Sequence, residues 1–489
     1  MNKKNPYIAI PQWILASLIF FVLLNSFAKT VIQFIFFDDQ PLASWRFLAK
    51  VLYYFVLYSP LIFYDKFKFG WFHPLVLPLV YKLSKSFVKS PSSFFDLRSF
   101  ANSAIISNQG IEHLTSYELA LNDIHNNLIN TFSWIVVYAT FYSLKNLKAP
   151  KFKTKRSKGV VFRLIVISLI GLGFGWYVIE LGGGIVQSIY SMGIGRFKQR
   201  SELGGSHWIV MSMMLTMACF VWFAYLKSAK YNPLFYFFFA ISLSIAFITT
   251  GSRSGLFIQI AVILLLYLYQ IRKIPLVISA SLGVIGFISI GILGQLRTSS
   301  WRSTELETDV VADFSFTEAV EKTRKEILVR PSGTMMVLGE GVQKEGLLLG
   351  RTYLSIPFFW IPRAIWPEKP RGCGAYAASL LLEDGSLKDN PSGGSGQSIT
   401  LTWQAEAYWN FHYPGILLVS ILYGMFLRFM GKLYITNRNI PAAVILCVIC
   451  LLTFSPQSDG STLLIQRLFI FALVMWLSGL WRPFNMKVA

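Results

Sequence analysis

The sequence predicts an all-α protein that crosses a membrane many times. Hydrophobic residues make up 54% of the 489 residues, charged residues make up 14%, and the mean hydropathy is +0.52. Apolar runs close to the roughly 20 residues that span a bilayer recur along the chain. Because every backbone polar group in lipid must be satisfied internally, and the alternating pattern of a β-barrel is absent, helices are the expected spanning elements.

These apolar runs predict about twelve membrane-spanning helices. The third is the weakest, because Pro74, Pro78 and Lys82 interrupt it. The expected spans are 10–37, 44–64, 71–88, 128–144, 160–180, 207–226, 233–250, 255–270, 274–295, 412–430, 440–456 and 462–481.

The spans divide the chain into three expected parts. An N-terminal bundle of about nine spans occupies 1–295, a long loop too polar to cross the membrane occupies 296–411, and three more spans occupy 412–489. Within the long loop, 313–329 has the charge pattern of an amphipathic helix lying along the surface, and we expect re-entrant-like segments beside it.

A basic loop predicts the orientation. The stretch from Lys145 to Lys158 contains seven basic residues and no acidic one, and short loops with such an excess stay in the cytoplasm. Counting crossings from it places both termini in the cytoplasm and the long loop outside. The net charge of +21 lies mainly in such short loops, which indicates contact with anionic membrane lipids rather than nucleic acid.

The four cysteines do not form a disulfide framework. Cys447 and Cys450 make a CxxC pair inside an apolar run, which is typical of small buried thiols. We therefore expect no redox or zinc role for these cysteines, and we assign no cofactor and no metal site to the chain.

The segment from Gly350 to Pro370 is the first candidate for a functional site. It reads GRTYLSIPFFWIPRAIWPEKP, and its four prolines favour a bent, preset path. Cations and indoles alternate along it and just beyond it: Arg351, Trp360, Arg363, Trp366, Lys369 and Arg371. Such a segment fits either a loop lying on the bilayer with its tryptophans at headgroup depth or a preorganised anion site facing a lipid-linked substrate.

A second candidate is the turn Thr250–Gly255, TGSRSG, which joins two spans. Arg253 lies there at the membrane boundary, where a charge is costly and often functional. Exposed amides at the start of the next helix would favour an oxyanion, and a guanidinium offers the two-pronged donor that a diphosphate accepts. The alternative is an arginine that simply reaches water from a tight turn.

A third candidate is Thr400–Gly415, TLTWQAEAYWNFHYPG. Glu406 and Asn410 are four residues apart and share one helix face. Desolvation near aromatic rings would disfavour the charged form of Glu406 and suit it to general base catalysis, unless it pairs with an external arginine. His412 is the other candidate base, or a histidine at a helix boundary.

Together these motifs resemble the Wzy-type polymerases of oligosaccharide repeat units, over roughly residues 230 to 470. The resemblance rests on TGSRSG, on GRTYLSIPFFWIPRAIWPEKP beside that family's G-x-x-Y … I-P-R-x-x-W-P-x-K-P, and on QAEAYWNFHYPG beside its G-E-x-Y-x-N-F-G-x-x-G. Two positions depart from the pattern: Ala405 and His412 stand where the family usually has glycine.

The resemblance implies an inverting, metal-independent glycosyl transfer on the periplasmic side of a bacterial inner membrane. A glycan carried on undecaprenyl diphosphate would be transferred to an incoming lipid-linked repeat unit, for O-antigen, capsule or exopolysaccharide, with a chain-length regulator as a candidate partner. Preorganised cations would stabilise the leaving diphosphate. Our assignments are Arg253 and Arg363 on the diphosphate, Arg297, Lys369 and Arg371 as secondary cations, Glu406 or His412 as base, and Trp360, Trp366, Tyr408 and Asn410 on the glycan.

Three rival functions remain open. An O-antigen ligase would use the same donor but a different acceptor. A lipid-phosphate-dependent glycosyltransferase would use Asp38 and Asp39 in the first external loop. A flippase would need charges deep inside spans and internal repeats; Lys29 and Glu180 are the few such charges noted, and no repeat is evident.

Overall fold

The computed structural model describes residues 10–36, 41–63, 69–81, 115–152, 158–185, 188, 206–226, 228–250, 253–271, 341–361, 365–382 and 401–480. Every regular element in these ranges is helical, which confirms the predicted fold class at that level. Asp38, Asp39, the span at 274–295 and the amphipathic helix at 313–329 lie outside the described residues.

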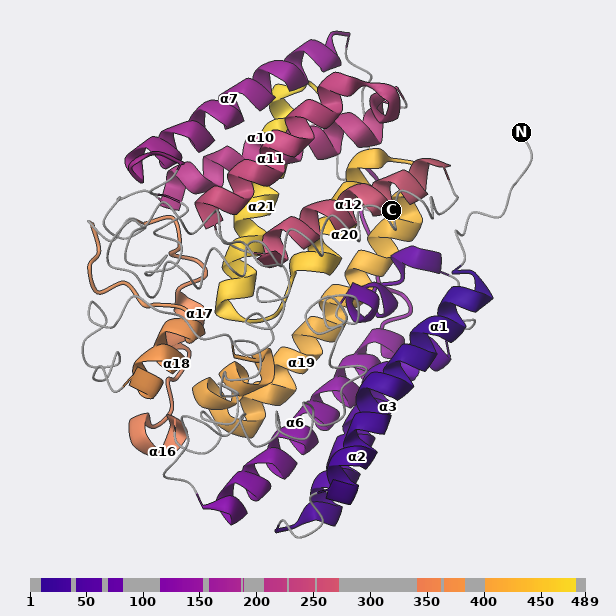
Figure 1. Ribbon diagram of the computed structural model, residues 1–489, viewed down its shortest axis with the longest axis vertical. Helices are drawn as coiled ribbons and strands as arrows, with labels where there is room; N and C mark the ends of the chain where they lie inside the picture. Colours follow the sequence, from indigo (N-terminus) through magenta and orange to yellow (C-terminus); the bar gives the residue numbers. More distant parts are fainter. Residues whose placement is uncertain are drawn as a thin grey trace, which may run out of the picture. The chain divides into compact units, whose positions relative to one another are not determined.

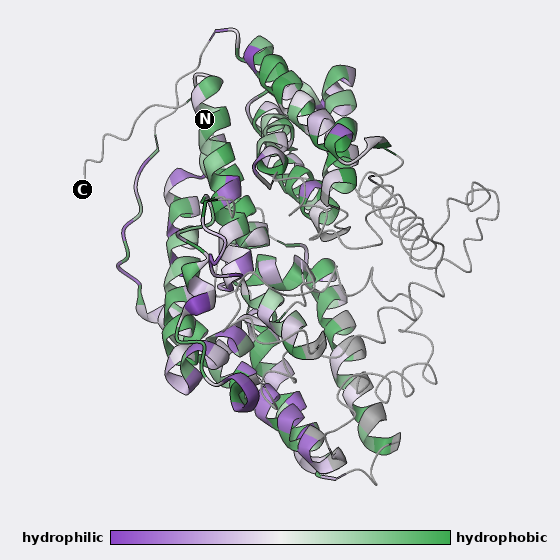
Figure 2. Cartoon of the chain, turned by 90° about the vertical axis from the view of Figure 1, so that its left-hand side faces the viewer, coloured by the Kyte–Doolittle hydropathy of each residue, from purple (hydrophilic) through white to green (hydrophobic). Residues whose placement is uncertain are grey.

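Four helices in the described part of the chain are long and apolar enough to cross a membrane. They are α7 (Val160–Leu181), α10 (Ser206–Tyr225), α19 (Trp403–Asn437) and α21 (Ser458–Leu477). The shorter apolar helices α11 (Pro233–Thr250), α12 (Arg253–Ile271) and α20 (Pro441–Thr453) coincide with three further predicted spans. Hydrophobic residues, green in Figure 2, predominate over most of the helical ribbon. The count of twelve spans stays a prediction.

The chain forms two compact units, each assembled from early and late parts of the sequence. The first contains Met1–Leu147, Arg324–Phe429 and Ser455–Thr462. The second contains Lys148–Thr323, Met430–Phe454 and Leu463–Ala489.

In the first unit, the first predicted span is one helical stretch: α1 (Gln12–Val22), a π-helical segment (Leu23–Ala28) and α2 (Lys29–Phe36). Helix α3 (Ala43–Ile62) packs beside α2 and α6 (Ser116–Ser143), as Figure 1 shows. Helix α19 crosses α6 so closely that a Cβ on Gly424 would lie 2.7 Å from the carbonyl oxygen of Val137.

Helix α6 begins twelve residues before the span expected at 128–144. Thr115 and Glu118 form a capping box, in which each side chain accepts a hydrogen bond from the other residue's backbone N–H. The first half of α6 is polar, and the sequence interpretation had assigned it to an external loop. The T-x-x-E signature at 115–118 could have located this start from sequence.

The described part of the predicted long loop contains three short helices, all in the first unit. They are α16 (Val342–Glu345), α17 (Arg351–Leu354) and α18 (Cys373–Leu382). Val342 of α16 and Tyr376 of α18 share a core with the start of α19, where Trp409 is fully buried. In the 350–354 segment, Gly350 and Thr352 are buried, whereas Leu354 is exposed.

In the second unit, α7, α10 and α11 lie side by side (Figure 1). Small residues permit this: a Cβ on Gly171 of α7 would overlap the backbone of Leu215 in α10, and one on Gly175 would lie 2.6 Å from the side chain of Ile245 in α11. Close approach at glycine is the usual packing mode of helices in lipid. Helix α12 packs on α10, α11 and α20.

Candidate functional site

Two sequence motifs that lie about 55 residues apart meet directly in the first unit. The backbone N–H groups of Leu348 and Leu349 donate to the carbonyl oxygens of Trp409 and Asn410 at 3.0 and 3.1 Å. The next N–H, of Gly350, donates to Asn410 Oδ1 at 2.9 Å. Gly350 has φ +86°, a left-handed conformation that glycine adopts without strain. The start of the GRTY motif is thereby fixed to the end of the QAEAYWN helix.

Asn410 is fully buried, and its amide is used within this framework. Its Nδ2 group donates to Thr352 Oγ1 at 2.8 Å and to the carbonyl oxygen of Glu406 at 2.9 Å, while Oδ1 accepts from Gly350. Although the sequence interpretation placed Asn410 against glycan, its contacts hold the two motifs together.

Glu406 is also fully buried and carries a hydrogen bond on each carboxylate oxygen. Thr352 Oγ1 donates to Oε1 at 2.6 Å, and the backbone N–H of Ser458 donates to Oε2 at 2.9 Å. Ser458 is the first residue of α21, where backbone N–H groups lack partners within the helix. Glu406 therefore satisfies a helix N-terminus, where a carboxylate is electrostatically favoured.

The first residues of α21 in turn cap α18. Ser458 Oγ accepts the N–H of Cys373 at 3.0 Å, and Asp459 Oδ2 accepts the N–H of Gly374 at 3.2 Å. A Cβ on Gly372 would overlap Asp459 Oδ1, so any larger residue there requires the carboxylate to move. Three helix ends are thus connected in series, from α19 through α21 to α18.

Cys373 and Tyr353 lie beside these carboxylates. Burial, followed by the negative charges of Glu406 and Asp459, raises the pKa of the Cys373 thiol, which makes it a poor nucleophile. Burial and the charge of Glu406 also raise the pKa of the Tyr353 hydroxyl. That hydroxyl is buried and has no hydrogen-bond partner among the described residues.

Helix α19 is broken directly after this network. His412 has φ 56° and ψ −146°, a region of backbone space occupied essentially by glycine, and Phe411 before it is also non-helical. This is one of the two positions at which the resembling family usually has glycine. The close approach continues at Gly415, where a Cβ would overlap the carbonyl oxygen of Ala407.

The break places His412 in a cluster of histidines and tyrosines. Its ring lies 4.4 Å from the ring of Tyr408 and 4.5 Å from that of Tyr413, measured between centroids. From α6, His125 Nε2 makes a hydrogen bond of 2.8 Å with the Tyr413 hydroxyl. His125 was not predicted, because the sequence places the polar half of α6 in a loop, and Tyr413 lies in the third candidate motif but has no role assigned there. His412 and His125 are both partly exposed, whereas Glu406 is fully enclosed.

The environment of His125 disfavours the protonated form of its ring. Burial, followed by electrostatic repulsion from His412, lowers the pKa of His125. The nitrogen that contacts Tyr413 is therefore a donor or an acceptor according to the tautomer. A neutral imidazole beside a second histidine and two phenols is suited to proton transfer.

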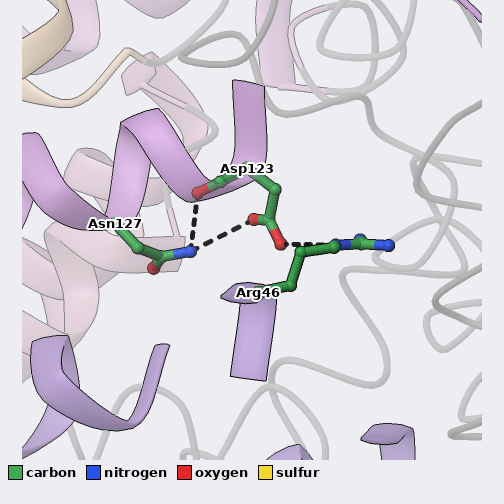
Figure 3. A network of polar contacts seen from close by, with 3 residues as sticks. All are labelled: Arg46, Asp123 and Asn127. Atoms are coloured by element: carbon green, nitrogen blue, oxygen red, sulfur yellow. Dashed lines mark hydrogen bonds and ion pairs between the residues drawn. The ribbon is translucent and has the colours of Figure 1, made fainter. Parts of the chain in front are cut away.

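An ion pair fixes the polar half of α6. Arg46 Nε of α3 contacts Asp123 Oδ2 at 3.2 Å, and Asn127 Nδ2 donates to Asp123 Oδ1 at 3.3 Å and to its carbonyl oxygen at 2.8 Å. Figure 3 shows Asp123 between these two side chains. The pair ties the helix that carries His125 to its neighbour.

Lys369, Trp360 and Trp366 contact residues of their own loop. Lys369 Nζ donates to the carbonyl oxygens of Ile361 and Phe359 and so folds the loop on itself. Trp366 packs edge-to-face on Phe358, while the indole of Trp360 is 61% exposed.

The structure describes only one of the remaining predicted cations with its side chain. Arg371 is partly buried. Arg363 and Arg297 lie outside the described residues, and Arg253 begins α12 in the second unit with its side chain outside them.

Comparison with known proteins gives no family. No protein-family model matches the chain, and neither a curated protein nor a solved structure is significantly similar to it.

Proposed function

We propose that this protein is a membrane glycosyltransferase that polymerises oligosaccharide repeat units carried on undecaprenyl diphosphate, on the external face of a bacterial cytoplasmic membrane. One observation supports the proposal above the others. The GRTY and QAEAYWN motifs, which carry much of the resemblance to repeat-unit polymerases, are hydrogen-bonded to each other through Gly350, Thr352 and Asn410. Motifs brought together in this way are expected if they build one site.

In the proposed reaction, a hydroxyl of the acceptor sugar attacks the anomeric carbon of the donor glycan. The new C–O bond forms as the bond from that carbon to the diphosphate oxygen breaks, and the configuration inverts. The hydroxyl proton passes to a base, and the diphosphate leaves with the electron pair. Cations stabilise that leaving group, a role we keep for Arg363.

Of the two bases that the sequence suggested, His412 fits the geometry better. A general base must come within hydrogen-bond distance of the proton that it removes. Both carboxylate oxygens of Glu406 are bound inside the protein, whereas His412 is partly exposed and lies against the ring of Tyr408, which is itself buried. Glu406 then holds the motifs in place.

The test is the glycan profile of cells that lack the protein, complemented with wild type, His412→Gln or Arg363→Ala. We expect deletion to reduce surface glycan to single repeat units while lipid-linked single units accumulate, and both variants to fail to restore the ladder. A matched control is His207→Gln, which changes a histidine at the start of α10 and should restore it. Long polymer retained on the carrier lipid would indicate a ligase instead, and repeat units trapped in the cytoplasmic leaflet would indicate a flippase.

A further inference from the structure

A chain of polar side chains crosses the apolar interior of the second unit. Ser242 Oγ of α11 donates to Gln259 Oε1 of α12 at 3.0 Å and lies 3.2 Å from Thr216 Oγ1 of α10. Because the Ser242 proton is used on Gln259, Thr216 must be the donor to Ser242. The Gln259 amide nitrogen makes no hydrogen bond among the described residues, so within them this series of hydrogen bonds ends at an amide with two further donors.

An arginine lies in the middle of an apolar helix of the same unit. Arg467 is the tenth residue of the twenty in α21, a helix with the length and composition of a membrane span. It lies within the span predicted at 462–481. A charge so far from either end of a span is costly and is retained where it has a function.

Arg467 and the polar chain line one cavity of about 60 Å³. The cavity also touches Ser212 of α10, Thr249 near the end of α11 and Gly255 near the start of α12. Neither aspartate nor glutamate is among the residues that line it. Its polar lining thus combines a cation and amide donors without a negative charge.

We propose that this cavity is an anion site that receives a phosphate group, with Arg467 and Gln259 as its principal donors. A guanidinium forms strong charge-assisted hydrogen bonds to phosphate. A water molecule needs at least roughly 10–15 Å³ of such space, so the cavity accommodates a few water-sized groups and excludes a sugar or an isoprenyl chain. The ligand is the phosphate end of a larger amphiphile or a free phosphate species.

The position of the cavity agrees with the predicted topology. Thr249 precedes the TGSRSG turn and Gly255 ends it, and the crossing order places this turn and the start of α10 on the external side. The lining of the cavity thus includes residues next to Arg253, which the sequence motif suggests for a diphosphate. Identifying the amphiphile as a lipid diphosphate rests on the proposed function; the anion site itself does not.

The experiment measures binding by the purified full-length protein in nanodiscs, without requiring enzymatic activity. The probes are farnesyl diphosphate, inorganic diphosphate and farnesol. The variants are Arg467→Gln, which removes the charge, and Gln259→Glu, which replaces the amide donors by a carboxyl group of the same shape. The control is Arg163→Gln, an arginine of the same unit at the start of α7 that does not line the cavity.

We expect wild type and Arg163→Gln to bind farnesyl diphosphate equally, and Arg467→Gln and Gln259→Glu each to bind at least tenfold more weakly. Equal affinity for inorganic diphosphate would identify a free phosphate species as sufficient, and weaker affinity would identify an amphiphile. Gln259→Glu preserves side-chain volume, so it still tests whether the cavity binds an anion if Arg467→Gln does not fold.

The anion site is rejected if wild type binds neither diphosphate, if farnesol binds as tightly as farnesyl diphosphate, or if folded Arg467→Gln or Gln259→Glu keeps wild-type affinity. The glycan profile of the deletion strain decides the polymerase proposal separately. If deletion abolishes the glycan ladder but the protein binds no diphosphate, the polymerase proposal stands and the anion site is rejected. If the protein binds diphosphate but deletion leaves the ladder intact, the anion site stands and the polymerase proposal is rejected.

Discussion

Glu406 accepts the backbone N–H of Ser458 at 2.9 Å and so joins the start of α19 to the start of α21. The same carboxylate accepts the hydroxyl of Thr352. Glu406, which the sequence suggests as a catalytic base, is therefore a structural link between three chain segments. Substitutions at Glu406 can distinguish a structural role from a catalytic one.

We expect Glu406→Ala to lower stability strongly, because it leaves the Thr352 hydroxyl and the Ser458 N–H buried without an acceptor. Each such group costs about 1–3 kcal/mol. Glu406→Gln keeps one acceptor oxygen and should fall between Glu406→Ala and wild type. Thermal unfolding in detergent measures the order. Wild-type melting temperatures for both variants, with activity lost in both, would instead make Glu406 a catalytic residue.

His412→Gly should raise stability while lowering the proposed polymerase activity. Relief of the strained backbone is worth about 1–3 kcal/mol, and the imidazole is lost. His412→Ala removes the imidazole but keeps the strain, so its melting temperature should lie below that of the glycine variant. A glycine variant that melts below the alanine variant would contradict the assigned backbone conformation.

Stability should fall with acidification through His125. Because the pKa of folded His125 lies below the ordinary value of 6.5, the unfolded chain binds the proton more readily, and unfolding takes up a proton. The contribution is present above pH 6.5 and is lost as pH falls toward the lowered pKa. The melting temperature of His125→Gln should therefore fall less than that of wild type between pH 7 and pH 5. His207→Gln is the control and should behave like wild type. Equal losses in the His125 variant and wild type would remove His125 as the cause.

The helical class and the positions of α7, α10, α11, α12 and α20 followed from hydropathy, because apolar length alone defines such helices. The meeting of Gly350 with Asn410 was not predictable, since it depends on how two distant segments fold together. Ser458 was missed for the same reason: nothing in its sequence indicates that its N–H faces a glutamate. Arg467 could have been found from the sequence, but a single charge among apolar residues changes the mean hydropathy of a window of about 20 residues very little.

Gly372→Ala tests the series of helix ends most directly. The added methyl would overlap Asp459 Oδ1, so the carboxylate must move and release the N–H of Gly374, which it accepts at 3.2 Å. Overpacking of this kind costs about 1–3 kcal/mol. Gly173→Ala in α7 is the control, because its Cβ would meet nothing within 4 Å.

The overlap also predicts the behaviour of a double variant. Asp459→Ala removes the atom that Gly372→Ala would strike, so the second change should cost little once the first is made. Residues in contact are expected to show such non-additivity. We therefore expect the double variant to melt close to Asp459→Ala alone, whereas additive losses would show that the Gly372 methyl and the Asp459 carboxylate do not meet.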